Sequence, residues 1–303
     1  MLPTPARPAP GPRPRRARRA VAVAAVLLGL AAAVTVAQTG GGDRSFAAAR
    51  TLTVATWNMC GVRQWNCADT GSRAVKQREL RHLATRAGAR AVLLQEACAG
   101  GVAAVRTSLG RPWHSAFRAY TERDGSGRVT TVRCAGSGQG AAGYAILAAY
   151  PLSDVTAVPS QQPTVGLRRG ILCATVAAHH VRLCTAHLSP AGSDRAHPDW
   201  EFRDDQLKAL VAAVPRRRTV YGGDLNVNPP GGANSASRVW PSAPYTIHRE
   251  CDQRSASSRA GRVTHASGHK LDYLFTGLPR LRCTVRDTGA SDHFALLVRV
   301  RTD

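Results

Sequence analysis

The sequence predicts a single α/β domain in which two packed β-sheets are covered on the outside by helices. Three observations predict this fold class. Many short apolar segments alternate with only a few helical ones, no internal repeat is visible, and 44% of the 303 residues are hydrophobic, which is enough for a sizeable core. This composition excludes wholesale disorder, and the presence of only one long apolar run excludes a multi-span membrane protein.

The predicted strands are short runs of β-branched and apolar residues. In chain order they are 51–57, 91–95, 144–149, 152–158, 172–177, 181–186, 218–221, 270–275, 281–286 and 293–300. Pro151 separates two of them, because proline cannot donate to a central ladder. Helices are predicted at 74–86, 100–109 and 199–214. In the last of these, Trp200, Leu207 and Leu210 fall on one face at a spacing of 3.6 residues. The Gly-rich segments 123–143 and 226–242 are predicted to be loops.

Residues 1–37 are typical of an export signal, followed by a linker at 38–50 and the folded domain at 51–303. The first 19 residues hold six arginines and no acid, and residues 20–37 carry no charge. Small residues suitable for cleavage end at Ala37 or Ala49. The apolar run barely reaches the length of about 17–25 residues that spans a bilayer, so an uncleaved signal anchor is the alternative. In both cases the domain lies outside the membrane, and we expect a secreted protein or one attached to the membrane only through this anchor.

Eight cysteines follow the apolar run, and an even number in an exported chain predicts disulfides. Zinc binding is disfavoured because no Cys-x-x-Cys occurs. A hairpin that turns at residues 178–179 would place Cys173 opposite Cys184, although this turn lacks the Asn-Gly pattern of two-residue hairpins. Cys60–Cys67 would close a short loop. Elimination then pairs Cys98 with Cys134 and Cys251 with Cys283.

Polar residues stand at the ends of several apolar strands, and together they indicate a site. They are Asn58, Glu96, His187, Asp224, Asn226, Asp272, Asp292 and His293. Contact with solvent at a strand end explains any one of these residues. It does not explain why such residues recur on separate strands. Carboxylates of this kind suit Mg²⁺ or Ca²⁺, and histidines suit acid–base work. No Ser or Cys nucleophile stands beside a base, which favours metal-assisted attack by water.

These residues lie in seven short motifs that resemble the endonuclease/exonuclease/phosphatase superfamily, the fold of DNase I. The motifs occur in the order found in that superfamily and cover residues 51–300: Thr56-Trp57-Asn58-Met59, Leu94-Gln95-Glu96, Tyr144-Ala145-Ile146-Leu147 with Tyr150-Pro151-Leu152, Thr185-Ala186-His187-Leu188, Gly223-Asp224-Leu225-Asn226, Leu271-Asp272-Tyr273-Leu274-Phe275 and Ser291-Asp292-His293. The resemblance implies an α+β fold with four layers, two mainly antiparallel sheets between outer helices.

The resemblance also implies a role for each residue. Glu96 is similar to the main metal-ligating glutamate, with Asn58 close to metal and phosphate and Asp292 as a second metal-side carboxylate. The implied ion is Mg²⁺, with Mn²⁺ or Ca²⁺ as alternatives.

The remaining five residues resemble the catalytic group. Asp224 is similar to the aspartate that orients or deprotonates the attacking water, and Asn226 is its phosphate-side neighbour. His293 resembles the histidine that contacts the scissile phosphate, held by Asp272. His187 resembles the histidine that stabilises the phosphate or assists the leaving group.

Two arginines precede the predicted strand at 172–177, and they have two interpretations. Arg168 and Arg169 either contact phosphate or form a solvated strand start. Among the histidines outside the motifs, His82 falls in a predicted helix. His265 and His269 flank a Ser-Gly loop before the Asp272 strand, where we expect a loop surface, with a position near the site as the alternative.

The substrate is the least determined part of the prediction. Lys and Arg total 41 against 19 acids, so the net charge is +22, and removal of six arginines with residues 1–37 leaves 22 − 6 = +16. Such a charge favours a polyanion. We therefore expect a monomeric, exported endonuclease that acts on DNA, or also on RNA, without a stable protein partner. The alternatives are an exported phosphodiesterase of lipid headgroups, similar to sphingomyelinases, and a catalytically inactive binding module.

Overall fold

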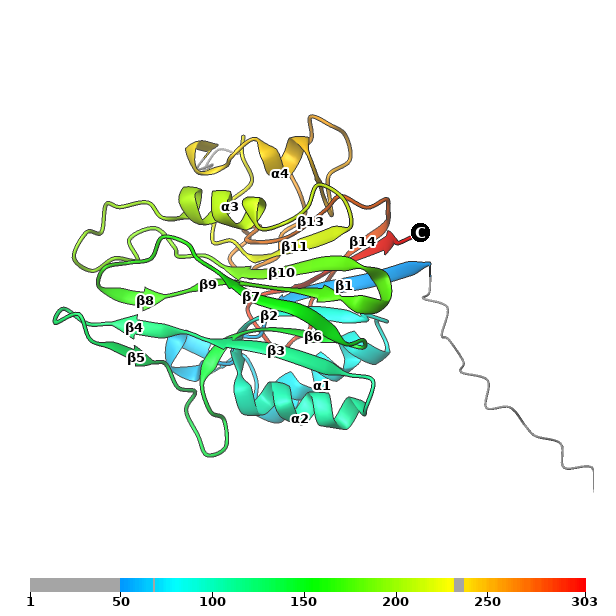
Figure 1. Cartoon of the computed structure of the whole chain (residues 1–303). Helices are drawn as coiled ribbons and strands as arrows, with labels where there is room; N and C mark the ends of the chain where they lie inside the picture. Colours follow the sequence, from blue (N-terminus) through cyan, green and yellow to red (C-terminus); the bar gives the residue numbers. More distant parts are fainter. Residues whose placement is uncertain (1–49, 68, 232–236) are drawn as a thin grey trace, which may run out of the picture. The chain divides into compact units, whose positions relative to one another are not determined.

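The computed structural model describes residues 50–303 except residue 68 and residues 232–236 (Figure 1). The predicted export segment, both cleavage positions and nearly the whole predicted linker lie outside the described residues. Within the described residues, no helix is long and apolar enough to cross a bilayer.

Two six-stranded sheets form the centre of the described domain. The first sheet has the order β14–β15–β1–β2–β6–β3, with strands Arg280–Arg286, Ala295–Arg301, Thr51–Asn58, Ala91–Cys98, Ala142–Ala148 and His114–Ala119. The second has the order β12–β13–β11–β10–β9–β7, with strands Arg249–Glu250, Asp272–Thr276, Thr219–Asp224, Val181–His187, Gly170–Val176 and Leu152–Val158. Each sheet is mixed, because one parallel pair, β1–β2 or β10–β11, lies among antiparallel pairs.

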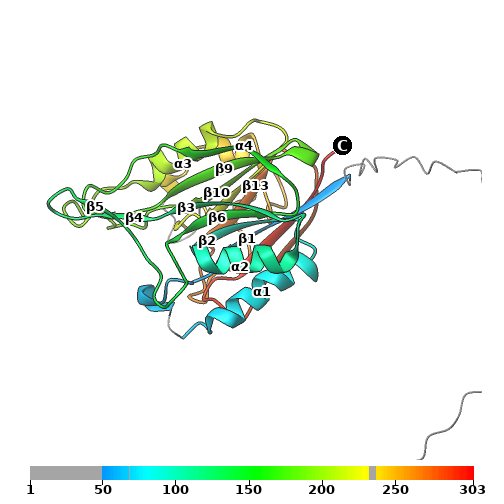
Figure 2. The same ribbon diagram turned by 60° about the horizontal axis from the view of Figure 1, so that its bottom comes forward.

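Helices cover the outer face of each sheet, which completes the four layers that the sequence predicts (Figures 1 and 2). On the first sheet lie α1 (Arg73–Thr85) and α2 (Ala99–Leu109), whose apolar residues pack with Trp57 and Leu94. On the second lie α3 (Arg203–Ala212) and the short α4 (Ala243–Thr246), which pack with Tyr221 and Phe275.

The two sheets face each other through a continuous apolar layer. Leu52, Val54 and Leu93 of the first sheet pack with residues such as Ala174 and Leu183 of the second, and all are fully buried. Alternating side chains of one strand thus enter different layers: Leu52 and Val54 point between the sheets, whereas Ala55 and Trp57 point toward the helices.

Polar contacts cross this apolar layer at Thr185, whose Oγ1 also lies 3.4 Å from the Leu94 carbonyl oxygen of the first sheet. The Gln95 amide Nε2 donates to Thr185 Oγ1 of the second sheet at 2.9 Å and lies 3.1 Å from Thr56 Oγ1 of the first. Because a buried polar group without a partner is costly, this contact favours a single alignment of the two sheets.

The structure corrects several predicted boundaries. The segment 123–143, predicted to be a loop, contains β5 (Val129–Thr131) and the start of β6. With β4 (Thr121–Arg123) and β8 (Gly166–Arg168), β5 forms a small third sheet. Polar, exposed residues alternate poorly with apolar ones there, so no strand pattern is visible in the sequence. The short β12 and the edge strand β3 were likewise not predicted.

The helix predicted at 199–214 is shorter, because α3 begins only at Arg203. Trp200 lies before the helix, is 45% exposed and stacks on His197 with ring centroids 3.8 Å apart. Asp204 and Asp205 occupy the first turn instead, where acidic side chains favour the positive end of the helix dipole. The loop predicted at 226–242 contains a 3₁₀ turn at Ser237–Val239, and part of it lies outside the described residues.

The predicted hairpin has the expected register but a different turn. Cys173 pairs with Cys184, and the last pair is Val176 with Val181. Four residues rather than two connect the strands: Ala177–His179 form a 3₁₀ turn and His180 is left-handed, with φ of 48°. The wider turn explains how the hairpin closes without Asn-Gly.

All eight cysteines form disulfides, and the four predicted pairings are confirmed. They are Cys60–Cys67, Cys98–Cys134, Cys173–Cys184 and Cys251–Cys283, with Cα–Cα distances between 4.1 and 6.0 Å. Two of them, Cys60–Cys67 and Cys98–Cys134, lie beside the end of β2, where Glu96 stands.

Candidate active site

The two parallel strand pairs bring the predicted site residues to one end of the sheets. In the first sheet Asn58 lies opposite Gln95, next to Glu96. In the second sheet His187 lies directly opposite Asp224, and Asp224 lies opposite Asp272 on its other side. His293 precedes β15, which runs antiparallel beside β1. The strand register therefore brings together polar residues that lie far apart in the sequence.

Asn58 connects the two sheets at this end. Its Nδ2 donates to Glu96 Oε1 at 3.3 Å and to Asp224 Oδ2 at 3.0 Å, while its Oδ1 accepts the Cys60 backbone N–H at 3.0 Å. The amide nitrogen therefore lies between two carboxylates from different sheets.

Glu96 stands at an irregularity in the pairing of β2 with β6 and has a positive φ of 47°. This strained backbone turns its side chain away from the regular alternation of the strand. Burial raises the pKa of Glu96 to about 7, against the opposing charges of His293 and Arg169. Within the described part of the chain, no basic side chain forms an ion pair with this carboxylate. Its close neighbours Cys60 and Cys67 are joined in a disulfide and offer no thiolate.

A second cluster surrounds His187, which is fully buried. Arg169 Nε donates to its Nε2 at 3.1 Å, so the ring proton lies on Nδ1, 2.7 Å from the Tyr120 hydroxyl. Tyr120 also accepts the Glu96 backbone N–H at 3.0 Å. Burial, together with the charges of Arg169 and His293, holds the pKa of His187 well below its usual value, so this imidazole is neutral.

His293 has the opposite electrostatic state. Its Nδ1 lies 2.9 Å from Asp272 Oδ2, and its Nε2 lies 3.7 Å from Asp224 Oδ2. Burial by itself lowers the pKa of His293, but the charges of Asp272 and Asp224 outweigh this effect and raise the pKa to about 10. The site thus holds one neutral and one charged imidazole, both facing the same oxygen of Asp224, with His187 Nε2 at 3.4 Å.

Asp292 lies on the outer side of this cluster. Its Oδ2 is 3.4 Å from His265 Nε2, and the rings of His265 and His293 lie edge to face with centroids 4.5 Å apart. Although burial raises the pKa of Asp292, the hydrogen bond from His265 and the charges of His293 and His265 lower it overall. Among the described residues, no group of possible metal-ligand atoms that all lie within 4.8 Å of one another contains both Glu96 and Asp292. Asp292 belongs to one with His265 and His293.

Asn226 is held in a left-handed conformation, with φ of 51°, directly after β11. Its backbone N–H donates to Asp224 Oδ1 at 3.0 Å, and its Nδ2 donates to the Leu188 carbonyl at 2.9 Å. Asn226 therefore fixes the orientation of the Asp224 carboxylate through its backbone.

Arg168 and Arg169 differ in position. Arg169 reaches into the site, where burial lowers its pKa against the charges of Tyr120, Glu96 and Asp224. Arg168 does not join the cluster. Both line a separate cavity of about 360 Å³ between the edges of the two sheets, together with Arg118, and the buried Nε of Arg168 has no hydrogen-bond partner in the described structure.

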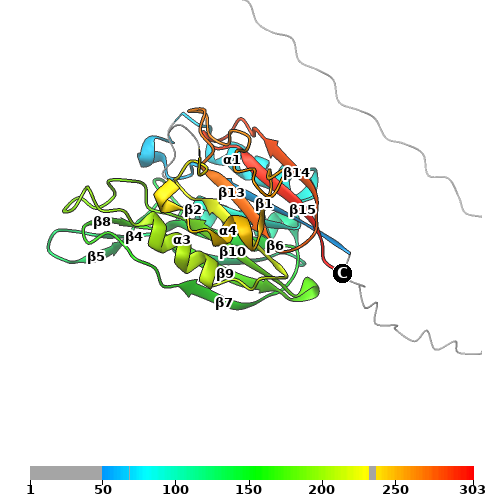
Figure 3. The ribbon, with the colours of Figure 1, turned by 90° about the horizontal axis from the view of Figure 1, so that it is seen from above.

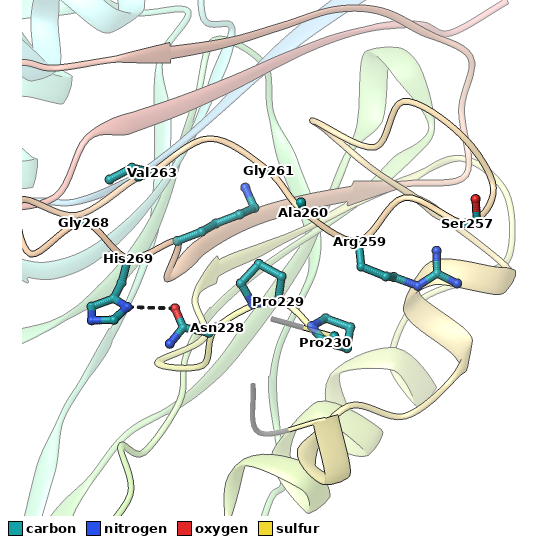
Figure 4. Close-up of a pocket in the computed structure, with 12 residues that line it drawn as sticks. Asn228, Pro229, Pro230, Ser257, Arg259, Ala260, Gly261, Val263, Gly268 and His269 are labelled. Carbon is teal, nitrogen blue, oxygen red and sulfur yellow. Dashed lines mark hydrogen bonds between the residues drawn. The ribbon is translucent and has the colours of Figure 1, made fainter. Parts of the chain in front are cut away.

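A further cavity of about 540 Å³ lies between the chain that leaves β11 and the chain that enters β13 (Figure 4). Asn228, Pro229, Arg259 and His269 line it, and Asn228 Oδ1 lies 3.1 Å from His269 Nδ1. None of the residues that the sequence assigns to the site lines this cavity.

Two residues of the cluster escaped the sequence prediction. Tyr120 lies between β3 and β4, two strands without a periodic pattern in the sequence, so only its position in space reveals it. His265 was expected on a loop surface, yet it contacts Asp292 and pairs with His293 in an isolated β-bridge. Its closeness in sequence to Asp272 was the only available signal.

Comparison with known proteins agrees with this geometry. A profile of the endonuclease/exonuclease/phosphatase family matches residues 55–293. The chain belongs to the endonuclease/exonuclease/phosphatase family. The family comprises hydrolases of phosphate esters, which include nucleases and phosphatases, and its members typically depend on divalent metals.

Solved structures of this family share the fold at low sequence identity. An endonuclease/exonuclease/phosphatase protein from Beutenbergia cavernae is 21% identical, with a TM-score of 0.57 over 84% of this chain and 72% of its own. The 3′-5′ exonuclease NExo from Neisseria meningitidis is 15% identical, with a TM-score of 0.56 over 82% and 100%. The human Nocturnin catalytic domain, with a bound sulfate anion, is 14% identical, with a TM-score of 0.56 over 82% and 93%. A search of curated protein sequences found no match.

Proposed function

We propose that this family member is an exported, divalent-metal-dependent phosphodiesterase that cleaves DNA endonucleolytically, by attack of water on the phosphorus. One observation carries the proposal. Side chains from both sheets converge on Asp224 Oδ2, where an amide, a neutral imidazole and a charged imidazole lie within 3.7 Å. A carboxylate fixed in this way suits activation of water, and two of the groups beside it, the Asn58 amide and charged His293, are donors that suit a phosphate.

The residues present fit a metal ion. Glu96 offers a partly buried carboxylate that forms no ion pair in the described structure, and the raised pKa shows that its charged form is costly there, a cost that a bound metal would offset. We assign Glu96 as the main ligand, with Asp292 as a second metal-side carboxylate and Asn58 beside the metal and the phosphate. Carboxylate oxygens favour Mg²⁺, with Mn²⁺ or Ca²⁺ as alternatives. When bound, the ion would neutralise charge that develops on the phosphate oxygens.

The remaining roles follow from the positions of the protons. Asp224 accepts a proton from water as the new oxygen–phosphorus bond forms and the bond from phosphorus to the leaving oxygen breaks. Charged His293, held through Nδ1 by Asp272, donates from Nε2 to a non-bridging oxygen. His187 and Asn226 lie on either side of Asp224. We assign His187 to the phosphate or the leaving oxygen. Because its Nε2 accepts the Arg169 N–H, the positive charge at this position is that of the Arg169 guanidinium, which His187 orients.

Export is supported by the four disulfides, which persist in oxidising compartments, and by the basic and apolar pattern of residues 1–37. The net charge of +16 calculated for residues 38–303 favours a polyanionic substrate.

The deciding experiment incubates the purified protein with supercoiled plasmid DNA, RNA or sphingomyelin, each with Mg²⁺ or with EDTA. We expect nicked and linear plasmid with Mg²⁺ only. Cleavage that persists in EDTA would contradict metal dependence. Release of phosphocholine without any DNA cleavage would replace the proposal by the lipid-headgroup alternative, and no turnover of any substrate would favour an inactive binding module.

The Glu96→Gln variant tests the metal assignment within this experiment. It keeps nearly the same shape but removes the charge, so turnover should fall roughly 100-fold or more while the melting temperature is retained. Turnover near that of the wild type would show that Glu96 is not the main ligand.

A further inference from the structure

A strongly basic cavity lies on the outer face of the first sheet, away from the candidate active site. Its volume is about 740 Å³, and its floor is formed by β14, β15 and β1, which Figure 3 shows side by side. Five arginines line it and no acidic residue does: Arg86, Arg90, Arg282, Arg286 and Arg299. In the described part of the chain, none of the five forms an ion pair. Arg299 donates only to the neutral Thr51 hydroxyl, at 3.3 Å.

The strand register places two of these charges against each other. Arg282 of β14 lies directly opposite Arg299 of β15, on the face that lines the cavity. Like charges directly opposite each other on neighbouring strands destabilise a sheet. Folding of the domain therefore gives no reason for this pair, whereas an anion bound between the two side chains would compensate the repulsion.

We propose that this cavity is a second binding site for the phosphate backbone of a nucleic acid. Guanidinium groups match the oxygens of phosphate in pairs, and five of them around a concave surface fit a chain of phosphates rather than one small anion. The identification of this ligand as a nucleic acid rests on the proposed nuclease function. A membrane surface fits less well, because the cavity is concave and no exposed large apolar side chain lines it.

The site is remote from the catalytic residues. It lies beside Thr51 and Thr53, near the beginning of β1, whereas Asn58 ends the same strand. At about 3.3 Å per residue, the seven steps from Thr51 to Asn58 span about 23 Å. A long nucleic acid can reach both places, whereas a small phosphodiester in the active site cannot.

The test measures binding of fluorescent 30-nucleotide DNA, single-stranded and duplex, in EDTA on a Glu96→Gln background that cannot cleave it. The cavity variant is Arg282→Gln/Arg286→Gln/Arg299→Gln. The matched control, Arg106→Gln/Arg111→Gln/Arg217→Gln, removes the same charge from exposed arginines outside the cavity. Because each lost phosphate contact lowers the salt dependence of log K by about 0.9, we expect the cavity variant to bind roughly tenfold or more weakly, with a salt slope smaller by about 2 to 3.

Equal weakening by the cavity and control variants would overturn the proposal, since net charge alone would then explain binding. Loss of binding to phosphatidylglycerol vesicles with unchanged DNA binding would also overturn it, in favour of a membrane. The triple Arg→Lys variant should keep the salt slope, and the melting temperature of the cavity variant should not fall.

Hydrolysis of bis(p-nitrophenyl) phosphate, measured without the Glu96 substitution, should be unchanged in the cavity variant, and a loss there would place these arginines in catalysis instead. If neither this ester nor DNA is hydrolysed by the wild type, the proposed function fails, and the binding comparison still decides the cavity.

Discussion

The charge of His293 depends on two carboxylates that come from the other sheet. Asp272 lies 2.9 Å from Nδ1 and Asp224 lies 3.7 Å from Nε2, and the resulting pKa of about 10 keeps the imidazole protonated at neutral pH. His187, a few ångströms away, is neutral because burial disfavours its charged form and because Arg169 and His293 place positive charge beside it. Both imidazoles are buried, and only His293 has two carboxylates that outweigh the effect of burial on its pKa.

The pair formed by Asp272 and His293 should act as a unit. Asp272→Asn and His293→Ala should each lower kcat roughly 100-fold or more. The double variant should have a kcat little below that of the less active single variant. Steady-state kinetics on a soluble phosphodiester would measure this. Strictly multiplicative losses would show that the two residues act separately.

The same pair predicts a pH dependence of stability. The pKa of His293 is about 10 in the folded protein, above the value of about 6.5 for a free histidine. Its stabilisation is therefore fully present below about pH 6.5 and is lost as pH rises through about 10. In EDTA, the difference in melting temperature between the wild type and His293→Gln should be larger at pH 6 than at pH 10. A constant difference would refute the charged form.

At the scale of elements, two of the four disulfides have different surroundings. Cys173–Cys184 joins two paired strands, and both of its cysteines are fully buried. Cys60–Cys67 closes a loop whose Cys67 sulfur lies 3.5 Å from Glu96 Oε2. The first belongs to the core of the second sheet, and the second forms part of the wall of the candidate site.

Removing one or the other of these two disulfides should therefore have different effects on stability and turnover. Cys173→Ala/Cys184→Ala should lower the free energy of unfolding by about 3 kcal/mol, as expected for a loop of this length, with modest loss of turnover per folded molecule. Cys60→Ser/Cys67→Ser should lower turnover more than stability. Urea unfolding and activity, measured on both variants, would detect the opposite pattern if this division is wrong.

The strand ends were predictable from the sequence because a polar residue after an apolar run is a local feature. Asn58, Glu96, His187 and Asp224 belong to this group, whereas Asp272 and His293 stand at the beginning of an apolar run. All six meet where the family resemblance implies. Tyr120, the buried position of Arg169 and His265 were not assigned, since each enters the site by a contact between segments distant in sequence. Strands β3, β4, β5 and β8 were not predicted for a related reason: β3 is an edge strand, the other three are only three residues long, and neither kind shows the clear alternation that burial on one face imposes.

At the scale of the whole molecule, Gln95 ties the two sheets together across an apolar layer. It is fully buried, and its amide is placed between Thr56 and Thr185. Gln95→Ala would leave both hydroxyls without this partner, so the free energy of unfolding should fall by about 1–3 kcal/mol. Because the whole domain still unfolds, the urea m-value should stay unchanged. A large change in the m-value would indicate that the sheets separate independently.

The pairing of the first strand with the last one has a consequence for synthesis. β1 lies between β2 and β15, and His293 lies two residues before β15 begins at Ala295. During translation, residues 51–58 emerge early, but their second edge is covered only when residues 295–301 have emerged. A nascent chain that still lacks residues 293–301 therefore holds neither the His293 imidazole nor a fully paired first strand, so its candidate site is incomplete.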